Sequence, residues 1–317
     1  MVSFQTNALV DNLAATVNLK CLNPVSQNTF QLADIVTVMD QELSLGVVPL
    51  IKKTTQEYFV YNVDQTIVNA KSSYTIPPRA VGNACRDIVL LDSAGNEVAL
   101  NQLMREYIKV QFPFNFVPSI WSFGQYMTGN EVNLYNTLIQ SYTAYKLRFI
   151  LERRPGGLTL STNCGQITAI TGNVLTLSNV DSTWTTSTTF DIINNFPPFQ
   201  SVQDDSVITL ISGQNVTFSN VPSTVAKGMW VCPAMLSCIP QIPYEFFPLL
   251  VERTVAVIAE ALDMSQLLAA SKAKIQEFDA NALALVRPRV KGSPRVIINK
   301  DSFGLRGFGG IGGGGYR

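Results

Sequence analysis

The chain has 317 residues, 46% of them apolar and 15% charged, so it can bury a substantial core and is not disordered by composition. Lys plus Arg equals Asp plus Glu, with 23 of each, so no global charge attracts nucleic acid or anionic lipid. The absence of histidine removes the commonest general base and zinc ligand, and it excludes Ser–His and Cys–His nucleophile pairs. We therefore expect a protein that is not an enzyme, built as two domains or as one domain with an insertion.

The N-terminal residues predict two amphipathic helices. Apolar side chains recur every four positions over residues 9–17 and again over residues 35–43, which is the spacing of one helix face. We expect the first helix to end near Lys20 and the second to be stopped by Gly46 and Pro49. The start of the chain lacks the basic and apolar regions of a signal peptide, and no apolar run reaches membrane-spanning length. We therefore expect a soluble protein made in a cytoplasm, with no membrane partner.

From residue 57 onward the pattern becomes typical of β-structure. Residues 57–68 and 145–151 alternate apolar and polar side chains and are rich in aromatic and β-branched residues, which predicts two strands. Turn signals at residues 93–96 and 128–130 are each flanked by strand-like segments, which predicts two hairpins. Residues 101–108 are predicted to form one or two helical turns between them.

The most informative internal feature is a repeat. The segment ITAITGNVLTLSNVDST from Ile167 aligns without a gap on ITLISGQNVTFSNVPST, which begins 41 positions later. Each copy, over residues 167–193 and 208–231, predicts a hairpin followed by a third strand. A single hairpin is marginal in water, so we expect the two copies to bury their apolar faces together. This predicts a small inserted β-barrel or sandwich at residues 156–236.

The segment after residue 240 is predicted to be helical. We expect one helix over residues 244–262 and a second one that Asp263 or Ser265 caps and Pro288 ends. Apolar side chains on the second helix alternate steps of three and four, which is the spacing of a helix–helix seam. The predicted seam consists of Leu268, Ile275, Phe278, Ala282 and Leu285.

The last residues, 287–317, are predicted to form an extended, glycine-rich docking arm. Residues 286–317 contain seven cations and one anion, which leaves 16 cations and 22 anions in the rest of the chain. An apolar triplet in the arm has little to bury against within its own domain, so we expect it to add a strand to a neighbour's sheet edge. A solvated terminus is the alternative on composition alone. The predicted docking residues are Arg287, Arg289, Lys291, Arg295, Val296, Ile297, Ile298 and Lys300.

No group of acidic residues forms a catalytic motif. Glu252, Glu260 and Asp263 lie near one another in the helical segment, and we interpret them as a solvated face because no paired acidic groups accompany them. Asp204 and Asp205 are interpreted as part of a hydrated turn. A histidine-free hydrolase is therefore only a minor alternative.

The cysteines and tryptophans also favour structural roles. The five cysteines are far apart in the sequence and odd in number, and neither a CxxC pair nor a histidine completes a metal-binding pattern. We expect buried, reduced thiols, with no cofactor and no metal ion. Trp121, Trp184 and Trp230 could form a carbohydrate platform, but core packing is the favoured interpretation of the Trp184 region.

Several segments are also similar to those of a known family. Across most of its length the chain resembles the head-to-tail adaptor, or connector, proteins of tailed bacteriophages. The segments that carry the resemblance are ELSLGVVPLI at 42–51, QEYFVYNVD at 56–64, YTIPPR at 74–79, RDIVLLDSAGNEV at 86–98, ERRPGGL at 152–158, PQIPYEFFPLLVERTVAVIAEAL at 240–262 and NALALVRPRVKGSPRVIIN at 281–299.

Together, the patterns and the resemblance predict an α+β fold. Its core is an α-helical bundle with flanking strands and hairpins, formed by residues 1–155 and completed by a helical hairpin at residues 237–286. The β domain at residues 156–236, made of two tandem repeats, is inserted into this core. The arm at residues 287–317 extends from it.

The resemblance implies a structural virion protein of the phage neck, assembled in the bacterial cytoplasm. Such a protein forms a ring beneath the portal, completes the DNA-filled head, and provides the platform for tail attachment and the channel for genome ejection. The implied partners are the portal protein, other copies in a ring of about twelve that matches portal symmetry, and downstream tail or neck proteins. Double-stranded DNA would pass through the lumen without being specifically bound.

Two alternatives from other functional classes stay open. A tail-fibre or receptor-binding module would use the aromatic β domain to hold polysaccharide. A DNA-binding or DNA-packaging accessory protein would use the basic arm instead. Glycan binding by residues 156–236 alone would favour the first alternative, and steeply salt-dependent binding to duplex DNA would favour the second.

Overall fold

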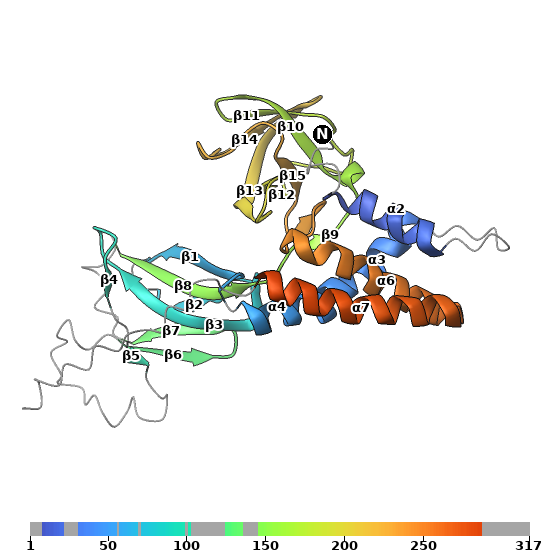
Figure 1. Cartoon of the computed structure of the whole chain (residues 1–317). Helices are drawn as coiled ribbons and strands as arrows, with labels where there is room; N and C mark the ends of the chain where they lie inside the picture. The colour runs from blue at the N-terminus through green and yellow to red at the C-terminus, as the bar shows by residue number, and fades with distance from the viewer. Residues whose placement is uncertain are drawn as a thin grey trace, which may run out of the picture.

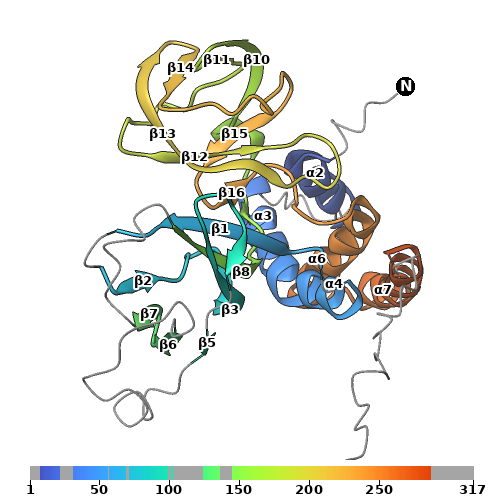
Figure 2. The same cartoon turned by 90° about the vertical axis from the view of Figure 1, so that its left-hand side faces the viewer.

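The computed structural model describes residues 8–21, 31–55, 57–68, 71–98, 101–102, 124–135 and 145–286. The protein is of the mixed α+β class, as predicted, and its described residues form three parts. Figures 1 and 2 show a β-barrel, a layer of helices and a pair of β-sheets that meet near the short strands β9 and β16. No helix in these ranges combines the length and apolar character needed to cross a membrane.

The helical part is organised around one central helix, α6. Helices α2, α3 and α7 each pack against α6, and most of the side chains of α6 are buried. Its sequence, FPLLVERTVAVIAEA, is apolar on nearly every face, which suits a helix that is surrounded. The helical segments are α2 (Val10–Cys21), α3 (Leu32–Glu42), the π-helical turn η1 (Leu43–Val47), α4 (Val48–Thr54), the 3-10 turn η5 (Tyr244–Phe246), α6 (Phe247–Ala261) and α7 (Ser265–Val286).

The expectation that Gly46 and Pro49 stop the second helix is wrong. The chain stays helical from α3 through the π turn into α4. Pro49 lies just after the π turn, where the regular i→i−4 hydrogen bonding of the helix is already interrupted and a residue without an N–H is tolerated. At Gly46 a Cβ would lie 2.9 Å from Nη1 of Arg253 and 3.0 Å from Oε2 of Glu42, so a larger residue would require these two side-chain ends to shift.

Two four-stranded sheets, ordered β1-β8-β3-β4 and β2-β7-β6-β5, share one apolar core. Tyr74 and Val132 contribute to this core from the second sheet, and Leu147 and Phe149 contribute from the first. Both predicted hairpins and both predicted strands are confirmed. The strands are β1 (Val60–Thr66), β2 (Ser73–Thr75), β3 (Ala80–Leu91), β4 (Glu97–Val98), β5 (Asn101–Gln102), β6 (Gly124–Thr128), β7 (Glu131–Tyr135) and β8 (Lys146–Arg153).

Residues 101–102 pair with β6 as a strand, so the helical turns predicted to begin there are wrong at these two positions. Residues 103–108, where the prediction continued, lie outside the described residues. A parallel pairing partner distant in the sequence explains the error, since local pattern carries no information about it.

The third part is a closed six-stranded barrel, which decides between the barrel and the sandwich predicted for this region. Its core is separate from the other two and includes Phe190 and Phe218, whose rings meet edge to face. The strand order around the barrel is β10-β11-β14-β13-β12-β15. The strands are β10 (Gly165–Thr171), β11 (Val174–Leu177), β12 (Thr189–Ile193), β13 (Ser201–Ser212), β14 (Asn215–Phe218) and β15 (Trp230–Pro233).

In two of the barrel's strand pairs, one position is paired with the residue 41 positions later in the chain. Leu175 of β11 is paired with Val216 of β14, and Asp191 of β12 is paired with Cys232 of β15. If a two-fold axis related the two halves of the barrel, equivalent positions on the strands beside the axis would be paired in this way.

The chain enters and leaves the barrel at one neck. Strand β9 (Gly157–Leu158) pairs in parallel with β16 (Leu236–Ser237). Two acidic side chains from the helices accept backbone N–H groups here: Asp40 from Leu158 at 2.9 Å and Asp11 from Ser161 at 2.9 Å. The neck is therefore attached to helices α2 and α3 by hydrogen bonds as well as by packing.

Alanine substitutions at three barrel glycines are expected to separate the free-energy cost of a left-handed backbone conformation from that of a steric clash. Gly172 and Gly213 have φ near +60° in open turns, so G172A and G213A should each lower the unfolding free energy by about 1 kcal/mol. At Gly165 a Cβ would lie 2.4 Å from the backbone oxygen of Asn179, so G165A should cost at least about 2 kcal/mol. Urea denaturation followed by tryptophan fluorescence measures all three, and a smaller loss for G165A than for G213A would contradict this account.

Candidate functional site

The docking arm predicted at residues 287–317 lies outside the described residues. The structure does place its origin, because helix α7 ends at Val286 beside helix α4. In Figure 1 this end of α7 lies where the helical layer meets the sheets.

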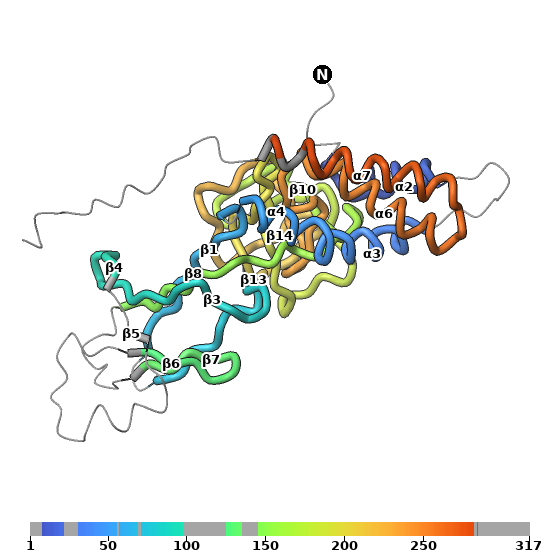
Figure 3. Tube along the Cα trace, turned by 60° about the horizontal axis from the view of Figure 1, so that its bottom comes forward, coloured from blue at the N-terminus to red at the C-terminus, as the bar shows by residue number. Residues whose placement is uncertain are grey.

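Helix α7 packs mainly against α6 along its length (Figure 3). Of the predicted seam residues, Ile275 and Phe278 are half-buried against the helical core, and Leu268 is half-buried outside it. The side chains of Ala282 and Leu285 are outside the described ones. Among the described side chains of α7, only that of Ser271 is fully buried. A helix of 22 residues is thus covered on one side only.

Glu252 corrects the interpretation of the acidic residues near α6 as a solvated face. Its side chain is buried and forms ion pairs with Lys20 of α2 and Lys274 of α7. Glu252 and Lys20 border a cavity of about 250 Å³ that Phe247 and Phe278 also line. Since a carboxylate is buried only when it is paired, Glu252 joins three helices through charge. Glu260 and Asp263 are exposed, as predicted.

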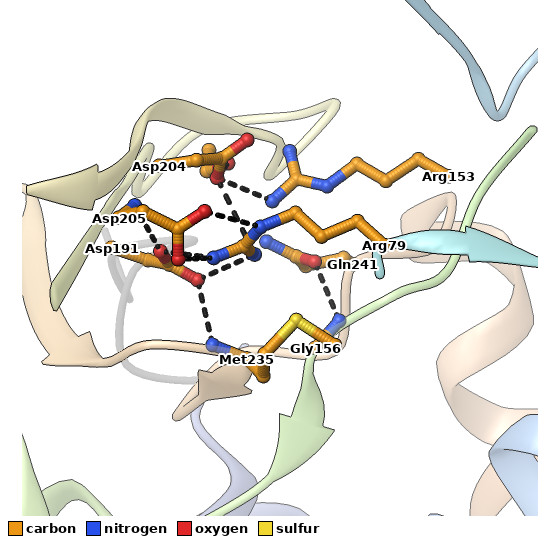
Figure 4. Close-up of polar contacts among 9 residues, drawn as sticks. Arg79, Arg153, Gly156, Asp191, Asp204, Asp205, Met235 and Gln241 are labelled. Atoms are coloured by element: carbon orange, nitrogen blue, oxygen red, sulfur yellow. Dashed lines mark hydrogen bonds and ion pairs between the residues drawn. The ribbon is translucent and has the colours of Figure 1, made fainter. Parts of the chain in front are cut away.

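The strongest polar cluster surrounds Arg79, at the junction of the sheets and the barrel (Figure 4). Its guanidinium is buried and donates two parallel hydrogen bonds to Asp191, at 2.8 and 2.7 Å. It also donates to Asp205 at 2.7 and 3.3 Å. The neighbouring Arg153 donates to Asp204 at 2.6 Å. Two arginines from the sheet part therefore hold three carboxylates of the barrel.

A β-bulge makes this arrangement possible. Asp204 and Asp205 are adjacent in β13, and adjacent side chains of a regular strand point to opposite faces. Here the register between β12 and β13 shifts, and Asp205 adopts a φ of 51°. Both carboxylates consequently face the arginines, and the backbone N–H of Asp205 also donates to Asp191 at 3.0 Å. The interpretation of this pair as a hydrated turn is wrong.

The charges of the cluster do not fully cancel, because three carboxylates face two guanidinium groups. Burial raises the pKa of Asp191, and hydrogen bonds from Arg79 lower it without offsetting the burial completely. For Arg79, burial lowers the pKa and the hydrogen bonds with Asp205 and Asp191 raise it, with a net upward direction. The guanidinium therefore stays charged and is fixed by its partners.

The cluster is a joint between the sheets and the barrel. The cavity beside it, lined by Tyr61, Arg153 and Gln241, holds about 20 Å³, which is space for about one water molecule. Backbone groups complete the joint: Met235 donates its N–H to Asp191, and Gly156 donates its N–H to Gln241.

Trp184 packs in the barrel core, as predicted. Its ring lies 4.5 Å from that of Phe190 and its side chain is buried. Trp230 is also buried and packs with the helical core, so neither of these residues forms an exposed carbohydrate platform. Trp121, the third tryptophan, lies outside the described residues.

Three of the five cysteines, which sequence reasoning treated as dispersed, come together. The Sγ atoms of Cys164, Cys232 and Cys238 lie within 4.8 Å of one another, and all three residues are buried. The repeat contained a signal for this meeting, because Cys164 precedes the first strand of copy one and Cys232 lies on the last strand of copy two. A closed barrel brings those two strands together, and β10 does pair with β15.

No protein-family model matches the sequence, and no curated protein matches it. The arguments about function therefore depend on the residues and on their arrangement.

Replacing Arg79 with methionine should leave three carboxylates crowded around one arginine. We expect R79M to lower the unfolding free energy by about 3–5 kcal/mol, the usual cost of removing one partner from a buried ion pair. The matched control is R86M, since Arg86 makes the same two-bond contact with Glu57 where both groups are exposed. Thermal and urea unfolding should show little change for R86M. Equal losses in the two variants would contradict the role assigned to Arg79.

Proposed function

We propose that this protein is a structural component of a tailed-phage virion that forms the head-to-tail adaptor ring beneath the portal. The observation that carries the proposal is helix α7, which has 22 residues, is covered mainly by α6 and leads directly into the basic arm. A long helix with one uncovered flank suits repeated side-by-side contact with other copies. The sequence resemblance to adaptor proteins points in the same direction.

The helical layer also carries apolar side chains that the single chain leaves exposed. Leu19 is 71% exposed and Leu45 is 81% exposed, and Val257 and Leu262 are partly uncovered. Single exposed apolar residues are common, but four on one helical layer add to the uncovered flank of α7. In the proposal these residues contact neighbouring copies in a ring that closes head to tail.

The charge distribution agrees with a DNA channel that does not bind DNA. Outside residues 286–317 the chain has 16 cations and 22 anions, so the body repels phosphates. In the proposed ring of about twelve copies the lumen passes DNA, and the basic arm reaches the portal or an adjacent subunit. The buried polar cluster is structural in this proposal, so no catalytic role is assigned to it.

The finer features of the fold are part of the same proposal. We infer that the helices form the bundle that serves as the ring's core. We also infer that the barrel arose by duplication of a three-stranded unit, since sequence identity and strand pairing both recur at an offset of 41 residues. The barrel then projects from the ring as a separate surface for tail or neck proteins.

Removing residues 287–317 tests the proposed docking role of the arm. The truncation ends where α7 ends, so the protein should remain folded and soluble, with an unchanged circular dichroism spectrum. It should lose the ability to join portal-containing heads, as measured by co-sedimentation with them and by electron microscopy of the heads.

A matched variant separates the charge of the arm from its apolar strand. Replacing Val296, Ile297 and Ile298 with serine keeps every cation and should abolish attachment if strand addition is the contact. Infectious particles completed by the truncated protein would exclude the docking role. Attachment that survives in the triple variant but falls steeply with salt would assign the contact to charge.

A further inference from the structure

The cluster of Cys164, Cys232 and Cys238 lies between the barrel and the helical layer. Cys164 follows a short 3-10 turn before β10, Cys232 is on β15, and Cys238 follows β16. All three are wholly buried and belong to the core that the helices share with this side of the barrel. The backbone oxygen of Cys238 accepts the N–H of Val10 at 2.9 Å, so the cluster also lies against the start of helix α2.

The spacing of the sulfur atoms suits a shared metal ion. The Sγ atoms of Cys232 and Cys238 are 3.8 Å apart, and the third sulfur lies within 4.8 Å of both. Two thiolates on a tetrahedral Zn²⁺, each with a Zn–S bond of about 2.3 Å, lie about 3.8 Å apart. A disulfide, by contrast, requires about 2.05 Å between its sulfurs. The observed spacing is too long for a disulfide and fits either an S–H···S hydrogen bond or two co-ligands of one ion.

The backbone also supports a ligand sulfur at the centre of the cluster. The backbone N–H of Cys238 donates a hydrogen bond to the sulfur of Cys232. A backbone N–H directed at a ligand sulfur commonly supports metal–thiolate sites. Because all three sulfurs are buried, a cluster of thiolates without a bound cation would be costly.

The two-fold relation of the barrel supplies an independent argument. The partner position of Cys232 is Asp191, and the position 41 residues after Cys164 is Asp205. Asp191 and Asp205 together bind one buried cation, the guanidinium of Arg79. The equivalent place in the other half of the barrel carries two of the three cysteines, and the described contacts of these sulfurs include no cationic side chain.

We propose that Cys164, Cys232 and Cys238 bind a thiophilic divalent metal ion, of which Zn²⁺ is the representative, as a structural site. Binding replaces the thiol protons with the metal ion and releases them to solvent. A tetrahedral ion takes its fourth ligand from a water molecule. The ion links the barrel to the helical layer, just as the ion pairs of Arg79 link the barrel to the sheets.

Cobalt substitution of the full-length protein tests the proposal directly. The purified, reduced chain is stripped with a chelator and titrated anaerobically with Co²⁺. We expect a thiolate-to-cobalt charge-transfer band that saturates at one equivalent and disappears when Zn²⁺ is added. If the unmodified protein gives no such band, the proposal fails, and this result does not depend on any variant folding.

Serine variants then assign the ligands. C232S should lose the band, and so should C164S, whose position just before β10 makes it the milder change. The matched control is C85S, because Cys85 lies half-buried in β3, distant from the cluster in the fold, and should leave the band unchanged. A band that persists in C232S and C164S, or that disappears in C85S, overturns the assignment.

Two further measurements address stability and oxidation. Zn²⁺ should raise the unfolding temperature of the unmodified chain and of C85S, and should not raise that of C164S, because a ligand stabilises only the state that binds it. The chain is isolated under native conditions and then unfolded in denaturant without reductant. Its free thiols are counted in this state. Five free thiols agree with the proposal, whereas a disulfide between Cys232 and Cys238 would overturn it.

Discussion

The placement of the barrel against the sheets depends on one buried guanidinium. Arg79 stands in the turn before β3, and its partners Asp191 and Asp205 come from β12 and β13 of the barrel. Arg79 and Asp191 are buried, and taking these two charges out of water costs several kcal/mol per ion unless hydrogen bonds offset it. A fixed bidentate geometry also restricts orientation, so the ion pair determines how the barrel is turned relative to the sheets.

Strand β12 shows how one segment can serve two cores at once. Phe190 and Ile192 point into the barrel, while Asp191 and Ile193 point out of it. The outward side chains meet Arg79 and the helical core, where Phe199 also stacks on Phe247 of α6 at 5.7 Å. Simple alternation along a strand is therefore sufficient to join the interior of the barrel to the rest of the protein.

Local patterns in the sequence predicted most helices and strands correctly. The errors occurred where the local structure depends on residues that are distant in the sequence. The alternation of apolar and polar residues predicted β1 and β8, and the repeat predicted the barrel strands. Both signals consist of local residue patterns. Gly46 looked like a helix stop, but the helix continues through it as a π turn that local pattern does not predict. Asp204 and Asp205 looked like a turn because a bulge depends on the partner strand. The cysteines looked dispersed because only closure of the barrel brings them together.

The neck formed by β9 and β16 has a consequence for the history and engineering of this chain. Since the two strands lie side by side, the barrel begins and ends at nearly one point, and the elements on either side keep their separation whatever lies between. A module attached in this way can be exchanged, enlarged or grafted while the host fold pays little loop-closure entropy. Exchange is limited mainly by the need for the new module to supply carboxylates to Arg79 and packing contacts to the helices. Variation among relatives is therefore expected to concentrate on the far side of the barrel.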